Sequence, residues 1–235
     1  MLPTTPTAPV FDLEQALILL YGPSKIGKST VASQANGALF LATEPGLNAL
    51  NVFQVPIGNW EDFIKACGDI AKGDHEFKTV VLDTVDNAKS MCSSYVCSRE
   101  GITHESELDY GKGWSLVSSE FRRVINKLAL LPYGLILISH SRVIEVKTRT
   151  GSLTRIVPTL PDKDREFVTG LVDMILFCDI DTSTDDDGEQ VETRVIRTKP
   201  SVHFDAGDRY NRLPDTIPMN YEAIRQAFTP VEGKE

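Results

Sequence analysis

The segment at residues 22–29 constrains the fold of this chain more than any other feature. It has the sequence GPSKIGKS and matches the pattern GxxxxGK[ST] at every fixed position. The apolar run at residues 16–21 before it predicts a buried strand, and residues 29–35 after it predict a helix that stops at Asn36-Gly37. A strand, a glycine-containing turn and the start of a helix form the context in which this pattern binds phosphate.

The chemistry of phosphate binding accounts for the residue types in this loop. The backbone must wrap closely around phosphate oxygens, so side chains at Gly22 and Gly27 would obstruct it, and the backbone N–H groups bind the anion. Lys28 places a positive charge at the β- and γ-phosphates, and the Ser29 hydroxyl is suited to ligate Mg²⁺. We therefore predict that the chain binds ATP, or a close relative, together with Mg²⁺. The predicted nucleotide-binding residues are Gly22, Pro23, Ser24, Lys25, Ile26, Gly27, Lys28, Ser29 and Thr30.

Acidic residues end two of the predicted strands. Asp83 closes the run KTVVLD at residues 78–83, and Glu44 follows the run ALFLA at residues 38–42. Because ligands of parallel sheets bind at the carboxyl ends of the strands, both carboxylates are expected near the phosphate loop. Asp83 is then suited to the magnesium shell, and Glu44 to accepting a proton from the water that attacks the γ-phosphate. The alternatives are a helix N-cap for Asp83, a role that Thr84 could equally fill, and an ordinary turn residue for Glu44.

His140 ends another apolar run, GLILIS at residues 134–139. A polar group at this place can sense the γ-phosphate and pass its presence to the segment that follows. A histidine that only caps the end of a strand is the alternative.

Apolar strands that alternate with helices predict an α/β fold. We expect a mainly parallel central sheet flanked by helices, with antiparallel edge strands and hairpins in the C-terminal half added to one edge. Residues 101–113 are polar and are expected to form an exposed loop, and the acidic residues 181–189 a solvated hairpin loop. Further strands are predicted at residues 52–57, 142–148, 153–157, 171–178 and 190–198, and further helices at residues 60–71, 85–99, 114–131 and 221–228.

Composition and charge restrict the partners that the chain can have. Its 235 residues are 41% hydrophobic and 24% charged, which is ordinary for one large soluble domain. The net charge of -9 disfavours general adhesion to nucleic acid but leaves room for a local basic site. No apolar run approaches the roughly 20 residues that span a bilayer, and the start of the chain is not a signal peptide. We expect a cytoplasmic protein without a membrane partner, whose four cysteines are reduced core thiols.

Several of these segments, taken in order, resemble the RecA/RadA-type ATPase core. More closely, the chain is similar to the small phage and prophage ATPases, or phage nucleotide-binding proteins, described as RecA-like single-strand annealing or recombination proteins. The resemblance covers about residues 15–215 and is carried by GPSKIGKST, LATEPG, VVLDT, ISHS and the late segments TKP and GDRYNRLP. The loop alone is specific only for P-loop proteins, whereas the ordered set of strand ends is more specific.

The resemblance implies roles for the residues at the strand ends. Glu44 corresponds to the hydrolytic glutamate, Asp83 to the magnesium-side acid, and His140 to the sensor position, where recombinases more often carry Gln. It also implies that a basic residue of a neighbouring subunit reaches the γ-phosphate. Lys199, with Arg197, is the best candidate for that role and Arg209 the next, and an ordinary surface charge is the alternative for each.

The resemblance further implies contact with DNA through the loops after the Asp83 helix and after His140. The segment 141–160 carries Arg142, Lys147, Arg149 and Arg155 against Glu145 alone, and such a basic patch can follow a phosphate backbone. In the loop at residues 101–113, Tyr110 is a candidate for stacking on a base. An ordinary solvated hairpin is the alternative.

Together these features predict a DNA-dependent, oligomeric ATPase that acts on single-stranded DNA in phage-type recombination or annealing. Residues 1–12 are expected to be a flexible segment and residues 13–230 a single RecA-like ATPase domain. The expected partners are single-stranded DNA, further copies of the chain in a ring or filament, and a single-stranded-DNA-binding protein. The expected location is the cytoplasm of a bacterial host, for a phage or prophage-encoded protein. A nucleotide or small-molecule kinase and a nucleotide-gated assembly module with little turnover remain as alternatives.

Overall fold

The strands of the protein form one sheet around the phosphate-loop strand. The computed structural model describes residues 2, 4–6, 10–148, 151–184 and 188–229. Hydrogen-bonded neighbours follow the order β10-β8-β7-β1-β5-β4-β2-β3, with β6 paired to β5 and β9 paired to β7. The strands are β1 (Leu17–Gly22), β2 (Ala38–Ala42), β3 (Phe53–Pro56), β4 (Thr79–Asp83), β5 (Gly134–Thr148), β6 (Gly151–Pro158), β7 (Met174–Thr184), β8 (Gln190–Arg197), β9 (Gly207–Asp208) and β10 (Thr216–Pro218).

The neighbouring strands β7, β1, β5, β4, β2 and β3 are parallel to one another. Their register brings the predicted site residues to one edge of the sheet. Gly22 pairs with His140 across β1 and β5, and Asp83 pairs with Ala42 across β4 and β2. The core order β7-β1-β5-β4-β2 places the phosphate-loop strand between β7 and β5. The predicted α/β class, with a mainly parallel central sheet flanked by helices, is confirmed.

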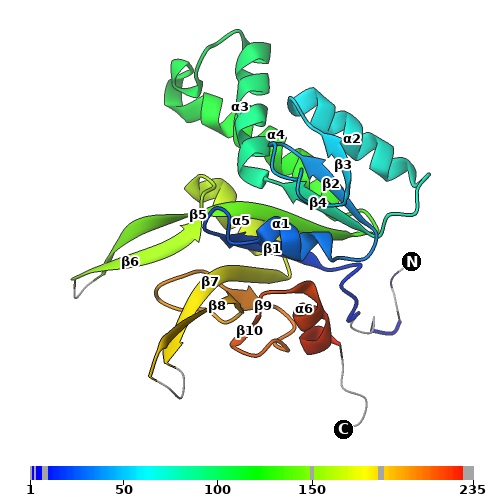
Figure 1. Cartoon of the computed structure of the whole chain (residues 1–235). Coiled ribbons are helices and arrows are strands. Elements are labelled where there is room, and N and C mark those ends of the chain that lie inside the picture. The colour runs from blue at the N-terminus through cyan, green and yellow to red at the C-terminus, as the bar shows by residue number, and fades with distance from the viewer. Residues whose placement is uncertain (1, 3, 7–9, 149–150, 185–187, 230–235) are drawn as a thin grey trace.

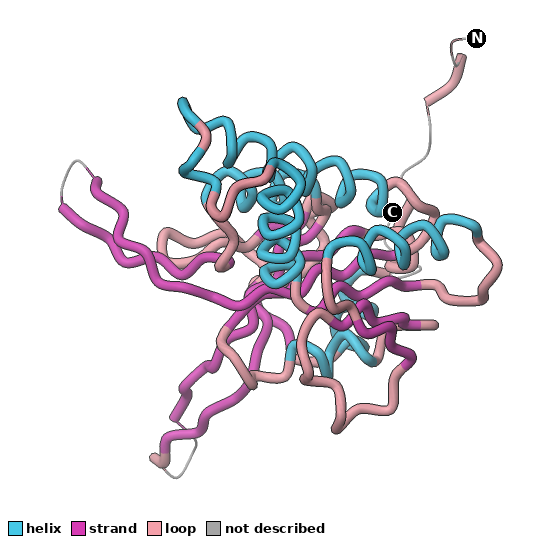
Figure 2. The backbone as a smooth tube through the Cα atoms, turned by 90° about the horizontal axis from the view of Figure 1, so that it is seen from above, coloured by secondary structure: helices cyan, strands magenta, loops and turns pink. Residues whose placement is uncertain are grey.

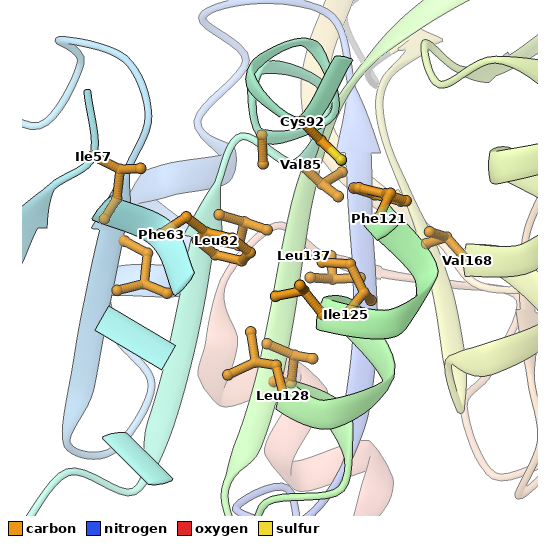
Figure 3. Close-up of a cluster of buried hydrophobic side chains, with 14 of the residues drawn as sticks. Ile57, Phe63, Leu82, Val85, Cys92, Phe121, Ile125, Leu128, Leu137 and Val168 are labelled. Atoms are coloured by element: carbon orange, nitrogen blue, oxygen red, sulfur yellow. The ribbon is translucent and has the colours of Figure 1, made fainter. Parts of the chain in front are cut away.

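Helices cover both faces of this sheet (Figures 1 and 2). Side chains of α2, α3, α4 and α5 join one buried cluster, part of which is drawn in Figure 3, and those of α1 and α6 join the other. Single 3₁₀ turns at Glu105–Glu107 and Asp109–Gly111 interrupt the loop before α4. The helices are α1 (Lys28–Ser33), α2 (Trp60–Lys72), α3 (Val85–Glu100), α4 (Lys112–Ala129), α5 (Asp162–Leu171) and α6 (Tyr221–Phe228).

Local capping explains where several of these helices begin and end. The side chains of Asn59 and Asn220 accept backbone hydrogen bonds at the starts of α2 and α6. Gly73 and Gly101 end α2 and α3 in the left-handed conformation. Thr84 is the N-cap of α3, and its hydroxyl accepts the N–H of the third helical residue. The cap role therefore belongs to Thr84, which leaves the neighbouring Asp83 carboxylate available to the site.

Two expectations about the C-terminal half were wrong. The strand predicted to end at residue 139 continues to Thr148, so β5 is a single strand that pairs with β1 and β4 and then with β6. Strands β8, β9 and β10 extend the β7 edge, whereas the β5–β6 hairpin projects from the middle of the sheet (Figures 1 and 2). The polar residues at the junction, HSR, interrupt the apolar run without ending the strand, because pairing with β6 replaces pairing within the sheet.

Helix α5 was missed, and the strand predicted from residue 171 begins at Met174. Only Asp164 and Val168 of α5 are buried, and its few apolar residues fall near the C-terminal end of a short, mostly polar segment. In the described part of the chain, no helix has the length and apolar content needed to cross a bilayer.

Candidate nucleotide-binding site

The phosphate loop joins β1 to α1 and depends on its two glycines. A Cβ atom added to Gly22 would lie 2.5 Å from the carbonyl oxygen of Cys178 on the neighbouring strand β7. Gly27 has a φ of 116°, a backbone conformation that residues with a side chain rarely adopt. Both glycines are therefore required by the backbone, one by close packing and the other by its dihedral angle.

Lys28 holds its ammonium group against the loop that precedes it. The Nζ atom donates hydrogen bonds to the carbonyl oxygens of Gly22, at 3.0 Å, and Pro23, at 2.8 Å. The residue is buried, and this burial lowers the pKa of the ammonium group. A charged group kept in the loop and away from carboxylate partners is well placed to meet a phosphate.

Ser29 and Asp83 form the part of the site that suits a magnesium ion. The Ser29 hydroxyl donates to the Asp83 carboxylate over 2.6 Å. Burial raises the pKa of the Asp83 carboxyl, an effect that the Ser29 hydrogen bond opposes. One hydroxyl and one carboxylate are hard oxygen ligands, and Mg²⁺ usually takes one or two such protein groups together with water and phosphate oxygens. The donor set therefore fits Mg²⁺.

His140 connects the phosphate loop to Glu44. Its Nδ1 lies 3.2 Å from the Ser24 hydroxyl, and its Nε2 lies 3.7 Å from Glu44 Oε1. The other carboxylate oxygen of Glu44 accepts a hydrogen bond of 3.0 Å from the Asn87 amide at the start of α3. Both the His140 and the Glu44 side chain are about one third exposed. The structure thus brings together the polar residues predicted at the ends of β2 and β5 and leaves them accessible to a ligand.

Asp86 is a residue of this site that the sequence analysis missed. Its carboxylate accepts the His140 backbone N–H at 2.7 Å and the Ser139 hydroxyl at 2.8 Å. Burial raises the pKa of this carboxyl. Asp86 therefore ties the sensor position of β5 to the first turn of α3. An acidic residue in a first helical turn is common, so the pattern DTVDN alone contains no sign of this contact.

The cations predicted to act across a subunit interface have partners in their own chain. Arg197 binds Asp179 and Asp181 on β7, at 3.2 and 2.7 Å. Lys199 donates to the Asn211 amide oxygen, and Arg209 binds Asp173 and two nearby carbonyl oxygens. None of the three hydrogen-bonds to the phosphate loop of its own chain. Their role in trans remains a prediction.

Another arginine of β8 does lie beside the loop. The Nη1 atom of Arg194 is 3.8 Å from the position that a Cβ would occupy on Gly27, and the terminal methyl of Met219 is 3.6 Å from it. These residues are distant from the loop in sequence, so no local pattern could have identified them.

The predicted DNA-binding cations are only partly free. Arg142 pairs with Asp162 at 2.8 Å and Arg155 with Asp205 at 2.6 Å. Lys147 is exposed on the hairpin, whereas Arg149 lies outside the described residues. Half of this patch is therefore neutralised by acidic partners in the same chain.

A cavity of about 770 Å³ lies among α3, α4 and the start of α5. Two exposed aromatic side chains line it, Tyr110, with its full surface accessible, and Trp114, which is 49% exposed. At its wall, the buried Asp164 binds Lys89 at 2.9 Å, and its other oxygen lies 3.7 Å from the Arg122 Nε without a hydrogen bond. The cavity thus combines flat apolar surfaces with polar atoms that lack a partner.

The chain has similarity to proteins of known sequence and of known structure. It is 24% identical over 215 residues to the SPbeta prophage-derived uncharacterized protein YorG of Bacillus subtilis (strain 168). The match covers 88% of this chain and 63% of that relative, so the chain spans less than two thirds of the relative's length.

Two solved structures are also similar. One is a prototypical ATPase from the type III secretion system of pathogenic bacteria, with a TM-score of 0.44 and 15% identity over 70% of this chain and 52% of that chain. The other is the flagellar accessory protein FlaH of Methanocaldococcus jannaschii, with a TM-score of 0.39 and 11% identity over 82% of this chain and 89% of that chain.

The family comparison agrees with the geometry of the site. The phosphate loop, the Ser29–Asp83 pair and the strand-end residues around them are arranged as in a P-loop ATPase. The family described as AAA domain matches residues 14–210, most of the chain, and the chain therefore belongs to the AAA domain family.

Proposed function

We propose that this protein hydrolyses ATP with Mg²⁺ and uses the cycle to act on single-stranded DNA in phage-type recombination or annealing. The observation that carries the ATPase part is a group of three polar side chains: His140 of β5 lies 3.2 Å from the Ser24 hydroxyl and 3.7 Å from Glu44. The loop that contains Lys28 and the Ser29–Asp83 pair belongs to the same site. The prophage origin of YorG, the relative with 24% identity, supports the phage setting.

Each residue has a distinct task in the proposed hydrolysis. The loop amides and Lys28 bind the phosphate chain, and Ser29 with Asp83 holds the magnesium ion, which neutralises charge that develops on the β- and γ-phosphates. Glu44 accepts a proton from a water molecule while the water oxygen bonds to the γ-phosphorus and the bond to the β-phosphate oxygen breaks. ADP and inorganic phosphate are the products. Asn87 keeps the Glu44 carboxylate oriented through its other oxygen.

His140 is proposed to report whether a γ-phosphate is present. It already contacts both the loop, through Ser24, and the proposed base, Glu44. A phosphate that binds between these groups competes for the same imidazole nitrogens. Because Asp86 holds the His140 backbone, a change at the imidazole is passed to α3.

The ATPase part is tested by binding and turnover together. Calorimetry should detect Mg-ATP binding by the wild-type chain, and Lys28→Ala should abolish it because the loop then lacks its ammonium group. Phosphate release should require both ATP and Mg²⁺. A folded wild-type chain that binds no Mg-nucleoside triphosphate would remove the proposed function as a whole.

The DNA part is supported by the surface around the cavity and the hairpin. Tyr110 and Trp114 offer exposed rings on which unpaired bases can stack, a contact worth about 1–3 kcal/mol per base. Arg142, at the base of the hairpin, pairs with Asp162, which also lines the cavity. Lys147 adds an exposed cation further along the same arm. Aromatic stacking and phosphate contacts are therefore available on adjoining surfaces.

Helix α3 offers a route by which DNA binding can alter hydrolysis. Asp86 contacts the nucleotide site through His140, and Lys89, three residues later, contacts the cavity through Asp164. Residues three apart lie on the same side of a helix. A ligand that engages Asp164 would compete with Lys89 and so act on the helix that positions His140.

The DNA part has its own experiment. We expect single-stranded DNA at low salt to bind and to stimulate phosphate release, and Tyr110→Ala and Trp114→Ala each to weaken binding about tenfold, the scale of one stacking contact. Phe53→Ala, which removes an exposed ring on the edge strand β3, is the matched control. Gel filtration with an ATP analogue and a short oligonucleotide would detect the proposed self-assembly. If DNA neither binds nor stimulates while ATP is still hydrolysed, the DNA part fails alone.

A further inference from the structure

Arg194 lies beside the phosphate loop, and no described residue of the chain forms a hydrogen bond or an ion pair with its side chain. Its guanidinium is 3.8 Å from the Cβ position of Gly27, the residue directly before Lys28. We propose that Arg194 binds the phosphate chain of the nucleotide held by the loop of its own chain. This inference rests on the proposed function, because it requires that the loop bind a nucleotide, and it adds a residue that acts in cis.

The lack of a partner sets Arg194 apart. In the described part of the chain, every other arginine has a carboxylate, a carbonyl oxygen or an aromatic ring as a partner. Arg197, three residues further along β8, is held by two aspartates, whereas the Arg194 side chain is exposed and has no ion pair or hydrogen bond with any residue that the structure describes. In a chain with a net charge of -9, an unpaired guanidinium beside an anion-binding loop is unusual. Guanidinium groups bind phosphate oxygens through charge-assisted, often bidentate, hydrogen bonds.

The sheet explains why this side chain reaches the loop and Arg197 does not. Side chains alternate between the two faces along a strand. Ile196 and its cross-strand partner Cys178 point into the buried cluster that includes α1. Arg194, two residues before Ile196, is on that same face, opposite Ile180. Arg197 is on the other face, which is why it meets Asp179 and Asp181.

The contact between β7 and the loop fixes this arrangement in place. The Gly22 Cα packs against the Cys178 carbonyl so closely that a Cβ would lie 2.5 Å from it. The edge formed by β7 and β8 therefore cannot move away from the loop without opening that contact. Met219, which follows β10, closes on Gly27 from the same side. Arg194 is thus held near the loop by backbone packing rather than by a side-chain partner.

Nucleotide affinity of single variants tests the proposal. We expect Arg194→Ala to raise the Kd for Mg-ATP by about tenfold to a hundredfold, the scale of one charge-assisted hydrogen bond. Arg194→Lys should keep part of the affinity, because it retains the charge but not the planar group. Arg225→Ala is the matched control, since it removes an equal charge from an exposed site on α6, where the guanidinium pairs with Glu222 of the same helix. Its Kd should equal that of the wild-type chain.

Mixed subunits separate action in cis from action in trans. A cis residue predicts that mixing Arg194→Ala with Lys28→Ala chains restores no turnover, because each chain then has a defective site. Restored turnover would assign Arg194 to a neighbouring subunit and overturn the proposal. If the wild-type chain binds ATP and the Arg194→Ala chain binds it with the same Kd, the proposal for Arg194 is also wrong. The proposed function is not affected by that outcome. A wild-type chain that binds no ATP would overturn both.

Discussion

The imidazole Nε2 of His140 lies 3.7 Å from Glu44 Oε1, although His140 is in β5 and Glu44 follows β2, two strands that are separated in the sheet by β4. The contact brings the proposed sensor and the proposed base within reach of one phosphate. It also places a group that responds to nucleotide beside the group that activates water.

Glu44→Gln should preserve ATP binding and lower the turnover number by about 10²-fold or more, the usual scale for loss of a positioned base. The amide keeps the size of the side chain and can still contact Asn87, but it accepts a proton from water very poorly. Calorimetry gives the Kd and a phosphate-release assay gives kcat.

Glu61→Gln, on the exposed side of α2, is the matched control for this substitution and should leave both quantities unchanged. Wild-type turnover by the Glu44 variant would remove Glu44 from the mechanism.

His140→Ala should lower kcat by about tenfold or more while changing the Kd for ATP less, because the imidazole links Ser24 to Glu44 but is not part of the loop. His140→Gln should recover part of the rate, since an amide can both donate and accept hydrogen bonds. Steady-state kinetics of the two variants provide the comparison. Equal rates for the Ala and Gln variants would show that hydrogen bonding at this position is irrelevant.

Gly22→Ala should destabilise the fold by about 1–3 kcal/mol or more, the cost of overpacking, because its Cβ would meet the Cys178 carbonyl. ATP binding should weaken with it, since the loop must shift. Gly46→Ala is the matched control: no atom lies within 4 Å of its added Cβ, and its stability should stay within about 0.5 kcal/mol of the wild type. Thermal unfolding measures both, and equal effects would contradict the packing argument.

Asp86 should make the stability of the protein depend on pH. Burial raises the pKa of this carboxyl in the folded state, so the folded chain holds the proton more tightly than the unfolded chain. The resulting stabilisation is present below the ordinary Asp pKa and is lost as the pH rises through the raised value. The melting temperature of Asp86→Asn, relative to the wild type, should therefore increase between pH 4 and pH 7.

Asp69 provides the opposite control, because its hydrogen bond to Lys72 lowers the pKa of its carboxyl. The stabilisation from Asp69 is present above the ordinary Asp pKa and is lost as the pH falls. The melting temperature of Asp69→Asn, relative to the wild type, should decrease over the same rise in pH. The same trend in both variants would contradict the assignment of burial as the cause for Asp86.

Lys199→Ala should lower turnover in a way that mixing with Lys28→Ala chains partly restores, if Lys199 reaches a neighbouring site. Arg197→Ala should instead lower stability by about 1 kcal/mol or less, since its half-exposed ion pairs to Asp179 and Asp181 are within its own chain. Turnover of mixed and unmixed samples distinguishes the two. Failure of the Lys199 variant to complement would end its proposed role in trans.

Local patterns predicted the elements that hold the site. The bounds of β2 and α6 match the prediction because an apolar run and a capped amphipathic segment mark them, and the phosphate loop was identified because each fixed position has a chemical reason. The strand-end residues Asp83, Glu44 and His140 followed from the rule that parallel strands present their carboxyl ends at one edge.

Other parts of the site depend on contacts between distant segments. Asp86 reaches His140 across 54 positions of sequence, and Arg194 reaches Gly27 from β8, a strand that lies between β7 and β10. The continuation of β5 past His140 depends on pairing with β6. The spacing of apolar residues within β5 does not indicate that pairing. Such pairings leave no mark in the spacing of apolar residues.

The uninterrupted course of β5 has a mechanical consequence. The first part of this strand pairs with β1 and β4, and the last part pairs with β6 in the hairpin. His140 lies where the two parts join. At this point of the strand, the Asp86 carboxylate accepts hydrogen bonds from the His140 backbone N–H and the Ser139 hydroxyl. His140 and the hairpin arm therefore belong to one continuous strand, so a ligand that contacts β6 would act on the same strand that presents the imidazole to Ser24 and Glu44.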